Sequence, residues 1–141
     1  MRLDSFFLAD AASTPGDGKF YIHGGGLSRF VVPMLPFPLT VAVFIRLQVD
    51  EAEVAAPHGF QVAVIGPTGQ PNVPPLDIQS TPGTEVQPLL EGEQRYAQIA
   101  LNVTLGIIRT GLYRVELHVD GDMLGNLPVP AVLAEPGDGV A

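Results

Sequence analysis

The stretch HGGGLS, residues 23–28, carries the residue types of an esterase active site. A histidine followed by three glycines forms the oxyanion hole of some serine hydrolases, because backbone N–H groups there face the reacting oxygen, and Ser28 would be the nucleophile. That nucleophile needs a strand-to-helix elbow, G-x-S-x-G, but Phe30 stands in place of the second glycine and a strand-like Val-Val pair follows. We therefore interpret Gly24, Gly25 and Gly26 as a bend within a strand and predict no catalytic residue.

Other side chains that could do chemistry lack partners at a useful spacing. Metal sites need converging ligands, such as two histidines on one turn of helix, and the histidines here are isolated. Asp120-Gly121-Asp122 resembles half of a calcium-binding loop, but the remaining ligands of that loop are missing. Asp50, Glu51 and Glu53 lie at a predicted helix start, where neighbouring carboxylates usually cap the helix. We predict no metal and no cofactor. The groups set aside in this way are His23, His58, His118, Lys19, Asp50, Glu51 and Glu53.

The composition excludes several classes of protein. The 141 residues are the size of one domain, and 46% hydrophobic against 16% charged residues is typical of a folded chain. A net charge of −8 disfavours nucleic acid and anionic membranes as partners. The chain has no cysteine, which excludes disulfides and cysteine-ligated zinc. Since neither a secretory signal nor a membrane-spanning stretch is visible, we expect a cytoplasmic protein.

Alternating hydrophobic and polar residues predict β-strands along most of the chain. Every second residue is apolar in residues 40–49, 96–105 and 113–119. This period of two is typical of strands with one buried face. Shorter strands are predicted at residues 3–12, 20–24, 28–32, 60–65 and 123–129, with an extended piece around 76–78.

Turn residues separate these strands and leave little room for helices. Asp17-Gly18 and Asp120-Gly121 lie between apolar runs and predict tight hairpins, because both residue types tolerate positive φ. One short helix is predicted at Glu51–Ala56, with Asp50 as its N-cap and Pro57 as its end. The proline-rich stretch 66–84 predicts a long loop.

These elements predict an all-β fold: an antiparallel, immunoglobulin-like β-sandwich of about seven to nine strands with at most one short helix. Residues 1–134 would form this single domain, and residues 135–141 a flexible C-terminal tail. Tyr113 follows a glycine and opens a strand, which is the position of a tyrosine corner, where the hydroxyl binds backbone slightly upstream. Structural roles are thus predicted for Gly24, Gly25, Gly26, Tyr113, Asp120 and Gly121.

Two predicted strands share a surface that has almost no charge. We name it the outer face, and it consists of Thr40, Ala42, Phe44, Arg46 and Gln48 together with Tyr96, Gln98, Ala100, Asn102 and Thr104. Sheet faces left to water normally carry charges, so we expect this face to be covered. Either a protein partner covers it through Phe44, Tyr96 and Ala100, or the chain's own N-terminal strand or the 66–84 loop does.

The function class that these observations favour is a non-enzymatic binding or scaffolding module, working with a protein partner or as a homo-oligomer, most simply a dimer. One alternative is a carrier that holds a small ligand in a pocket between the sheets. A serine hydrolase using HGGGLS is a further alternative.

Several stretches resemble a family of uncharacterised bacterial proteins. They are ADAASTPGDGKFYIHGGG (9–26), FPLTVAVFIRL, and GLYRVELHVDGDMLG (111–125), and the family shares an AD…DGK…GG opening. The resemblance implies a small domain with an immunoglobulin-like sandwich and no assigned function. It carries over no catalytic or binding residue.

Overall fold

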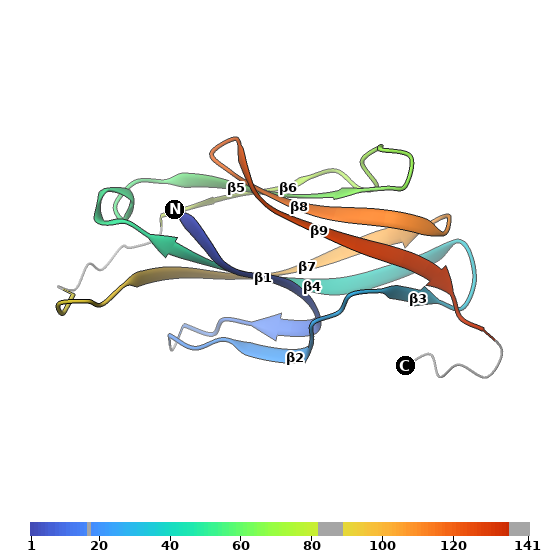
Figure 1. Cartoon of the computed structure of the whole chain (residues 1–141), viewed down its shortest axis with the longest axis horizontal. Coiled ribbons are helices and arrows are strands. Elements are labelled where there is room, and N and C mark those ends of the chain that lie inside the picture. Colours follow the sequence, from blue (N-terminus) through green and yellow to red (C-terminus); the bar gives the residue numbers. More distant parts are fainter. Residues whose placement is uncertain (17, 82–88, 136–141) are drawn as a thin grey trace.

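The computed structural model describes residues 1–16, 18–81 and 89–135, and these residues form an all-β protein (Figure 1). The predicted fold class is confirmed, with nine strands among the described residues. They are β1 (Arg2–Ser13), β2 (Tyr21–Gly25), β3 (Phe30–Val32), β4 (Phe37–Val49), β5 (His58–Ile65), β6 (Leu76–Ser80), β7 (Arg95–Ile107), β8 (Gly111–Val119) and β9 (Asp122–Leu133). Asp17 of the first predicted hairpin, and all of the predicted tail except Glu135, lie outside the described residues.

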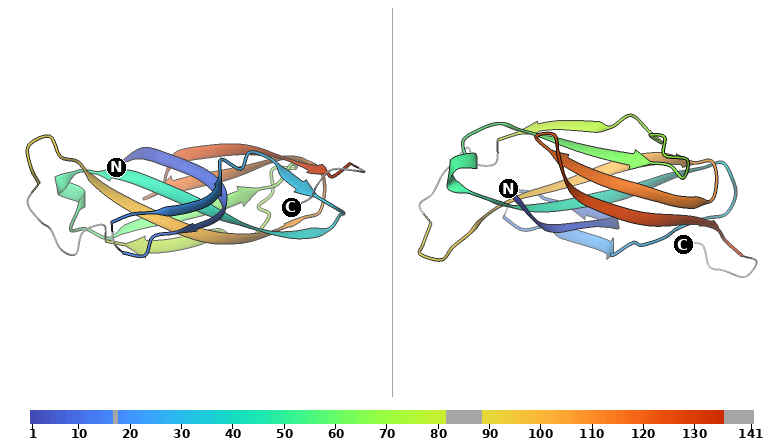
Figure 2. Two further views of the ribbon diagram at one scale, coloured as in Figure 1. Left: turned by 90° about the horizontal axis from the view of Figure 1, so that it is seen from below. Right: turned by 45° about the horizontal axis from the view of Figure 1, so that its top comes forward.

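The strands form two sheets, which lie in two layers (Figure 2). One sheet has the order β2-β1-β4-β7 and the other the order β3-β9-β8-β5-β6. The pairing is antiparallel except between β3 and β9, which run parallel, a detail that hydrophobic patterns do not reveal. The orders β1-β4-β7 and β9-β8-β5-β6 correspond to the A-B-E and G-F-C-C′ strands of immunoglobulin domains. They support the predicted immunoglobulin-like topology, which stays a prediction.

The core lies between the sheets and uses the alternating positions that the sequence predicts. Val43 and Ile45 of β4, Leu105 of β7, and Val115 and Leu117 of β8 are each at most 1% exposed. Every buried residue among those described is hydrophobic. Burying one such side chain contributes about 1.5–3 kcal/mol, so the packing of these strands supplies most of the driving force for the fold.

The turn signal at Asp120-Gly121 and the helix signal hold, although the helix is shorter than predicted. Asp120 and Gly121 have φ values of 50° and 88°, the pair of positive angles that a type I′ hairpin requires. The helix is a single 3-10 turn, η1 (Glu51–Glu53), shorter than the predicted Glu51–Ala56. The next residue, Val54, is the C-cap of this turn, and its side chain is only 3% exposed.

Tyr113 has the geometry of a tyrosine corner. Its side chain is fully buried, and its ring meets Phe30 of β3 edge-on at a centroid distance of 6.3 Å. The hydroxyl donates a hydrogen bond of 2.9 Å to the carbonyl oxygen of Arg109, four residues upstream. This bond ties the connection before β8 to the core, which is the role that the sequence predicts for this residue.

Candidate functional site

The glycines of HGGGLS end strand β2, and the backbone there is bonded to the neighbouring strand. The N–H groups of Gly26 and Leu27 both donate to the carbonyl oxygen of Leu8, each at 3.0 Å. An oxyanion hole needs such donors aimed at substrate, and here the neighbouring strand uses them. Ser28 follows as an exposed residue before β3, with no helix behind it. The geometry therefore supports a bend in the backbone.

Glycine is required at this bend for two reasons. Gly24 and Gly26 have φ values of 62° and 79°, which side chains rarely allow. The Asp10 carboxylate of β1 also occupies the space that a Cβ atom on Gly24 would need, and Ile22 lies within 2.8 Å of a Cβ built on Gly25.

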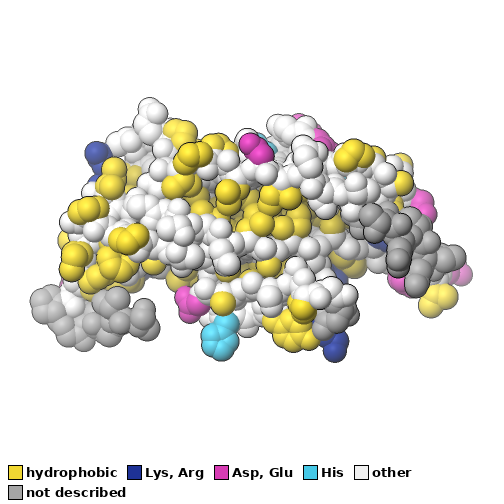
Figure 3. All heavy atoms as spheres, turned by 180° about the vertical axis from the view of Figure 1, so that it is seen from behind, with side chains coloured by type: hydrophobic (Ala, Val, Ile, Leu, Met, Phe, Trp, Pro, Cys, Tyr) yellow, Lys and Arg dark blue, Asp and Glu magenta, His cyan; other side chains and the backbone are white. Residues whose placement is uncertain are grey.

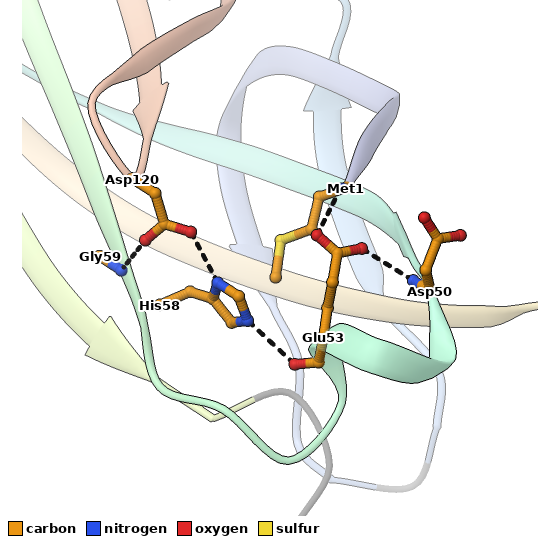
Figure 4. A network of polar contacts seen from close by, with 6 residues as sticks. All are labelled: Met1, Asp50, Glu53, His58, Gly59 and Asp120. Carbon is orange, nitrogen blue, oxygen red and sulfur yellow. Dashed lines mark hydrogen bonds and ion pairs between the residues drawn. The ribbon is translucent and has the colours of Figure 1, made fainter.

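A charged cluster at one end of the sandwich joins residues that are isolated in the sequence (Figure 4). His58 Nδ1 lies 2.6 Å from Asp120 Oδ2, although 62 positions separate the two residues. The other carboxylate oxygen of Asp120 accepts a bond of 2.9 Å from the N–H of Gly59, and His58 Nε2 lies 2.9 Å from the carbonyl oxygen of Glu53. A carbonyl only accepts, so Nε2 carries a proton, and the carboxylate favours a second proton on Nδ1.

The same contacts set the charge states of the cluster. The hydrogen bond with Asp120 raises the pKa of His58, and the hydrogen bond with His58 lowers the pKa of Asp120. The amino group of Met1, 2.6 Å from a carboxylate oxygen of Glu53, lowers the pKa of that carboxyl. The cluster thus links η1, the start of β5 and the β8–β9 hairpin through hydrogen bonds and ion pairs. Among the described residues, no group of three or more His, Cys, Asp or Glu is placed to hold a metal ion.

We expect the stability contributed by the His58–Asp120 ion pair to depend on pH. Because the folded pKa of His58 is raised, its contribution is complete below the unfolded-state value of about 6.5 and is lost as the pH rises through the folded value. Asp120→Asn keeps the positive-φ turn and the acceptor for Gly59 but removes the charge. Urea unfolding of both proteins from about pH 5 to about pH 9 should show a stability difference that shrinks at the alkaline end.

An NMR titration of the His58 ring gives the control for that result. In Asp120→Asn the pKa of His58 should move back down toward the value usual for histidine. A stability difference that stays constant across the pH range would show that the ion pair is not the source of the effect.

The outer face is partly covered by the chain itself. Phe44, at its centre, is fully buried, with its ring centroid 5.1 Å from that of Phe7 and 4.5 Å from that of Phe20. Phe20 belongs to the β1–β2 connection, where the Gly18 carbonyl also accepts a bond of 3.3 Å from the Gln98 side chain. The prediction that Phe44 forms part of an exposed interface is therefore wrong, because the N-terminal hairpin folds back over it.

The other two candidate interface residues lie at the β7 margin of the outer face. Tyr96 is 39% exposed, and the guanidinium of Arg46 stacks 3.6 Å from its ring centroid. Arg46 also pairs with Asp4 at 2.8 Å, so its charge is engaged within the chain. Ala100 is half-buried. The β7 margin of the outer face is therefore more accessible than its centre at Phe44.

Strand β7 is an unusual sheet edge. It has 13 residues and pairs with β4 in an unbroken register, and within the described residues no strand pairs with its other side. From Tyr96 to Ile107 it contains no charge and no proline. Seen from behind, this side of the molecule shows uncharged and hydrophobic side chains across its middle (Figure 3). Natural edge strands normally avoid unwanted pairing by being short or bulged, or by carrying charges or proline.

The other edges in the described part of the sheets have such protection. Strands β2, β3 and β6 have only five, three and five residues. Strand β2 pairs with β1 only from Ala9 onward, so the earlier residues of β1 also form an edge. This part of β1 carries Arg2 and Asp4 and contains a break in register. Strand β3 pairs with β9 only from Ala131 onward, and the unpaired edge of β9 before that residue contains Pro128 and Pro130. The contrast makes β7 the candidate functional site.

The backbone groups that β7 presents can be assigned from one proline. Pro38 has no N–H and lies opposite Gly106, so this pair is not hydrogen-bonded. Bonded and non-bonded pairs alternate along an antiparallel ladder, so Tyr96, Gln98 and the other even-numbered residues of β7 direct their N–H and C=O groups away from β4. The carbonyl oxygen of Gly106 accordingly accepts a bond of 2.9 Å from the Asn72 side chain. We define the β7 edge as these outward-directed backbone groups.

The absence of charge in residues 96–107 was the visible signal for this site. The sequence suggested that these residues form part of an exposed sheet face, whereas the structure shows that they form a sheet edge.

No helix among the described residues is long and apolar enough to cross a membrane. No curated protein matches the chain. A family model matches residues 4–132, and the chain therefore belongs to the family of unknown function DUF6941.

Proposed function

We propose that the protein is a non-enzymatic interaction module that binds a polypeptide strand along the β7 edge. The observation that carries this proposal is a 13-residue edge strand that has no proline, no bulge and no charge after its first residue, Arg95, whereas the other sheet edges among the described residues are short or protected. Strand addition supplies affinity through main-chain hydrogen bonds and needs no deep pocket. A cytoplasmic setting is part of the proposal, because a chain without cysteine has no disulfides to keep oxidised.

Two other functions are less well supported by the geometry. A hydrolase at HGGGLS would need the Gly26 and Leu27 N–H groups that Leu8 already binds. A carrier would need room between the sheets, where large side chains including Phe60 and Tyr113 are packed. An open hollow of about 470 Å³ lies outside the sheets instead, along the β1–β2 hairpin.

The proposal predicts site-specific cross-linking in cells that express the protein naturally. A photo-reactive amino acid at Asn102, an exposed position in the middle of the β7 edge, should give a discrete protein adduct, because a paired strand would lie about 4.8 Å away. The matched control is the same amino acid at Ser28, which is also exposed but follows β2 at the opposite edge of the sheet. Gel mobility and mass spectrometry would compare the two proteins.

A second substitution separates strand pairing from simple proximity. Ala100→Pro removes an N–H that points away from β4, so the β4–β7 ladder keeps its hydrogen bonds and the sheet should remain folded. The adduct at residue 102 should be lost in this background. Adducts of equal yield at both positions, or at neither, would contradict the proposed function.

A further inference from the structure

We propose that the strand bound at the β7 edge is β7 of a second copy of this chain, paired antiparallel about a two-fold axis at Asn102. This inference rests on the proposed function and names its partner. The pairing would join two four-stranded sheets into one continuous sheet across the dimer.

The position of the axis follows from the parts of the edge that are already occupied. Near one end, the Asn72 amide binds the carbonyl oxygen of Gly106. Near the other end, the Gln98 side chain donates a hydrogen bond of 3.3 Å to the Gly18 carbonyl oxygen, so the β1–β2 connection lies beside the strand there. The stretch that the described part of the chain leaves open runs from residue 99 to residue 105, and its midpoint is Asn102.

An axis at Asn102 satisfies the hydrogen-bonding pattern of the edge. Asn102 would face Asn102 of the second copy, and Ala100 would face Thr104. These even-numbered residues direct both N–H and C=O outward, so they would form the bonded pairs of the new ladder. An axis that placed even-numbered residues opposite odd-numbered ones would leave these groups unpaired.

The side chains in this register are also compatible. On the inner side Ile99 would face Leu105 and Leu101 would face Val103, so apolar groups meet apolar groups. On the outer side the open stretch has only Ala100, Asn102 and Thr104, which are small and uncharged. Two copies of a chain with a net charge of −8 repel each other, and this stretch lets them approach without placing carboxylates opposite one another.

Charge substitutions at the axis give the decisive test on the full-length protein. By sedimentation velocity over a range of concentrations, the wild type should show a species of twice the 14.9 kDa chain mass. Asn102→Asp is nearly isosteric and would place two like charges opposite each other, so dimerisation should weaken by about fivefold or more. Ser28→Asp, the matched control, adds the same charge at the opposite edge of the sheet and should dimerise like wild type.

A mixing experiment makes the test specific for self-pairing. Asn102→Lys should also weaken its own dimer, whereas a mixture with Asn102→Asp should restore association, because opposite charges would then meet at the axis. Thermal melts of each variant would confirm that the fold is retained. Restored association in the mixture supports the proposal, and equal dimerisation of all variants, or a wild type that is monomeric throughout, would overturn it.

Disulfide formation tests the register independently. Because the chain has no cysteine, Asn102→Cys introduces a single thiol, and its partner across the axis would lie within the 4.4–6.8 Å Cα separation that a disulfide spans. Oxidation should give a covalent dimer with Asn102→Cys and far less with Ser28→Cys. Cellular adducts at residue 102 of a mass other than the dimer, with a monomeric purified protein, would refute self-pairing but leave the interaction module standing.

Discussion

Replacing Tyr113 with alanine should lower the free energy of unfolding by about 4 kcal/mol. The side chain is completely buried, it packs edge-on against Phe30, and its hydroxyl holds the Arg109 carbonyl at 2.9 Å. Truncation would therefore leave a cavity between the sheets and an unpaired carbonyl in the connection before β8. Urea unfolding followed by circular dichroism measures the loss.

Tyr113→Phe divides this effect into its two parts. It keeps the ring and removes only the hydroxyl, so it should cost about 1 kcal/mol, the usual value for one hydrogen bond to a partly buried partner. Tyr96→Phe is the matched control, because Tyr96 is 39% exposed and should tolerate the same change with little loss. Unfolding curves of Tyr113→Phe and wild type that coincide would show that the corner bond contributes nothing.

Phe44→Ala should lower the free energy of unfolding by about 3 kcal/mol, even though the residue lies on the outer face of a sheet. Phe44 is 0% exposed because the rings of Phe7 and Phe20 cover it. Phe20→Ala should cost less, since Phe20 is itself 43% exposed and loses less buried area. Chemical unfolding of both variants, with limited proteolysis of the β1–β2 connection, checks the order of these effects.

The outcome for Phe44 also decides where a partner can bind. A loss of stability within about 0.5 kcal/mol would be typical of a surface position and would reopen the whole outer face as an interface. A loss near the expected value means that this part of the face is closed by the chain's own hairpin. The β7 edge then remains as the accessible surface, and the charge and cross-linking experiments at Asn102 test it directly.

The sequence predicted the strands well because the signals for them are local. Side chains alternate between the two faces of any strand, so the period of two in residues 40–49, 96–105 and 113–119 identifies both the strands and their buried sides. The type I′ turn at Asp120-Gly121 and the corner bond of Tyr113 are equally local, since the latter spans four residues. These features require no knowledge of which strands are neighbours.

The candidate site required the tertiary structure because it depends on sheet order. Alternation shows that Phe44 points away from the core, but it cannot show that Phe20 folds back to cover it. The pairing of His58 with Asp120 across 62 positions is equally invisible in the sequence, because only the placement of β5 beside β8 brings the two together. The same holds for β7: a run without charge can lie inside a sheet or at its margin, and only the order β2-β1-β4-β7 turns it into an open edge.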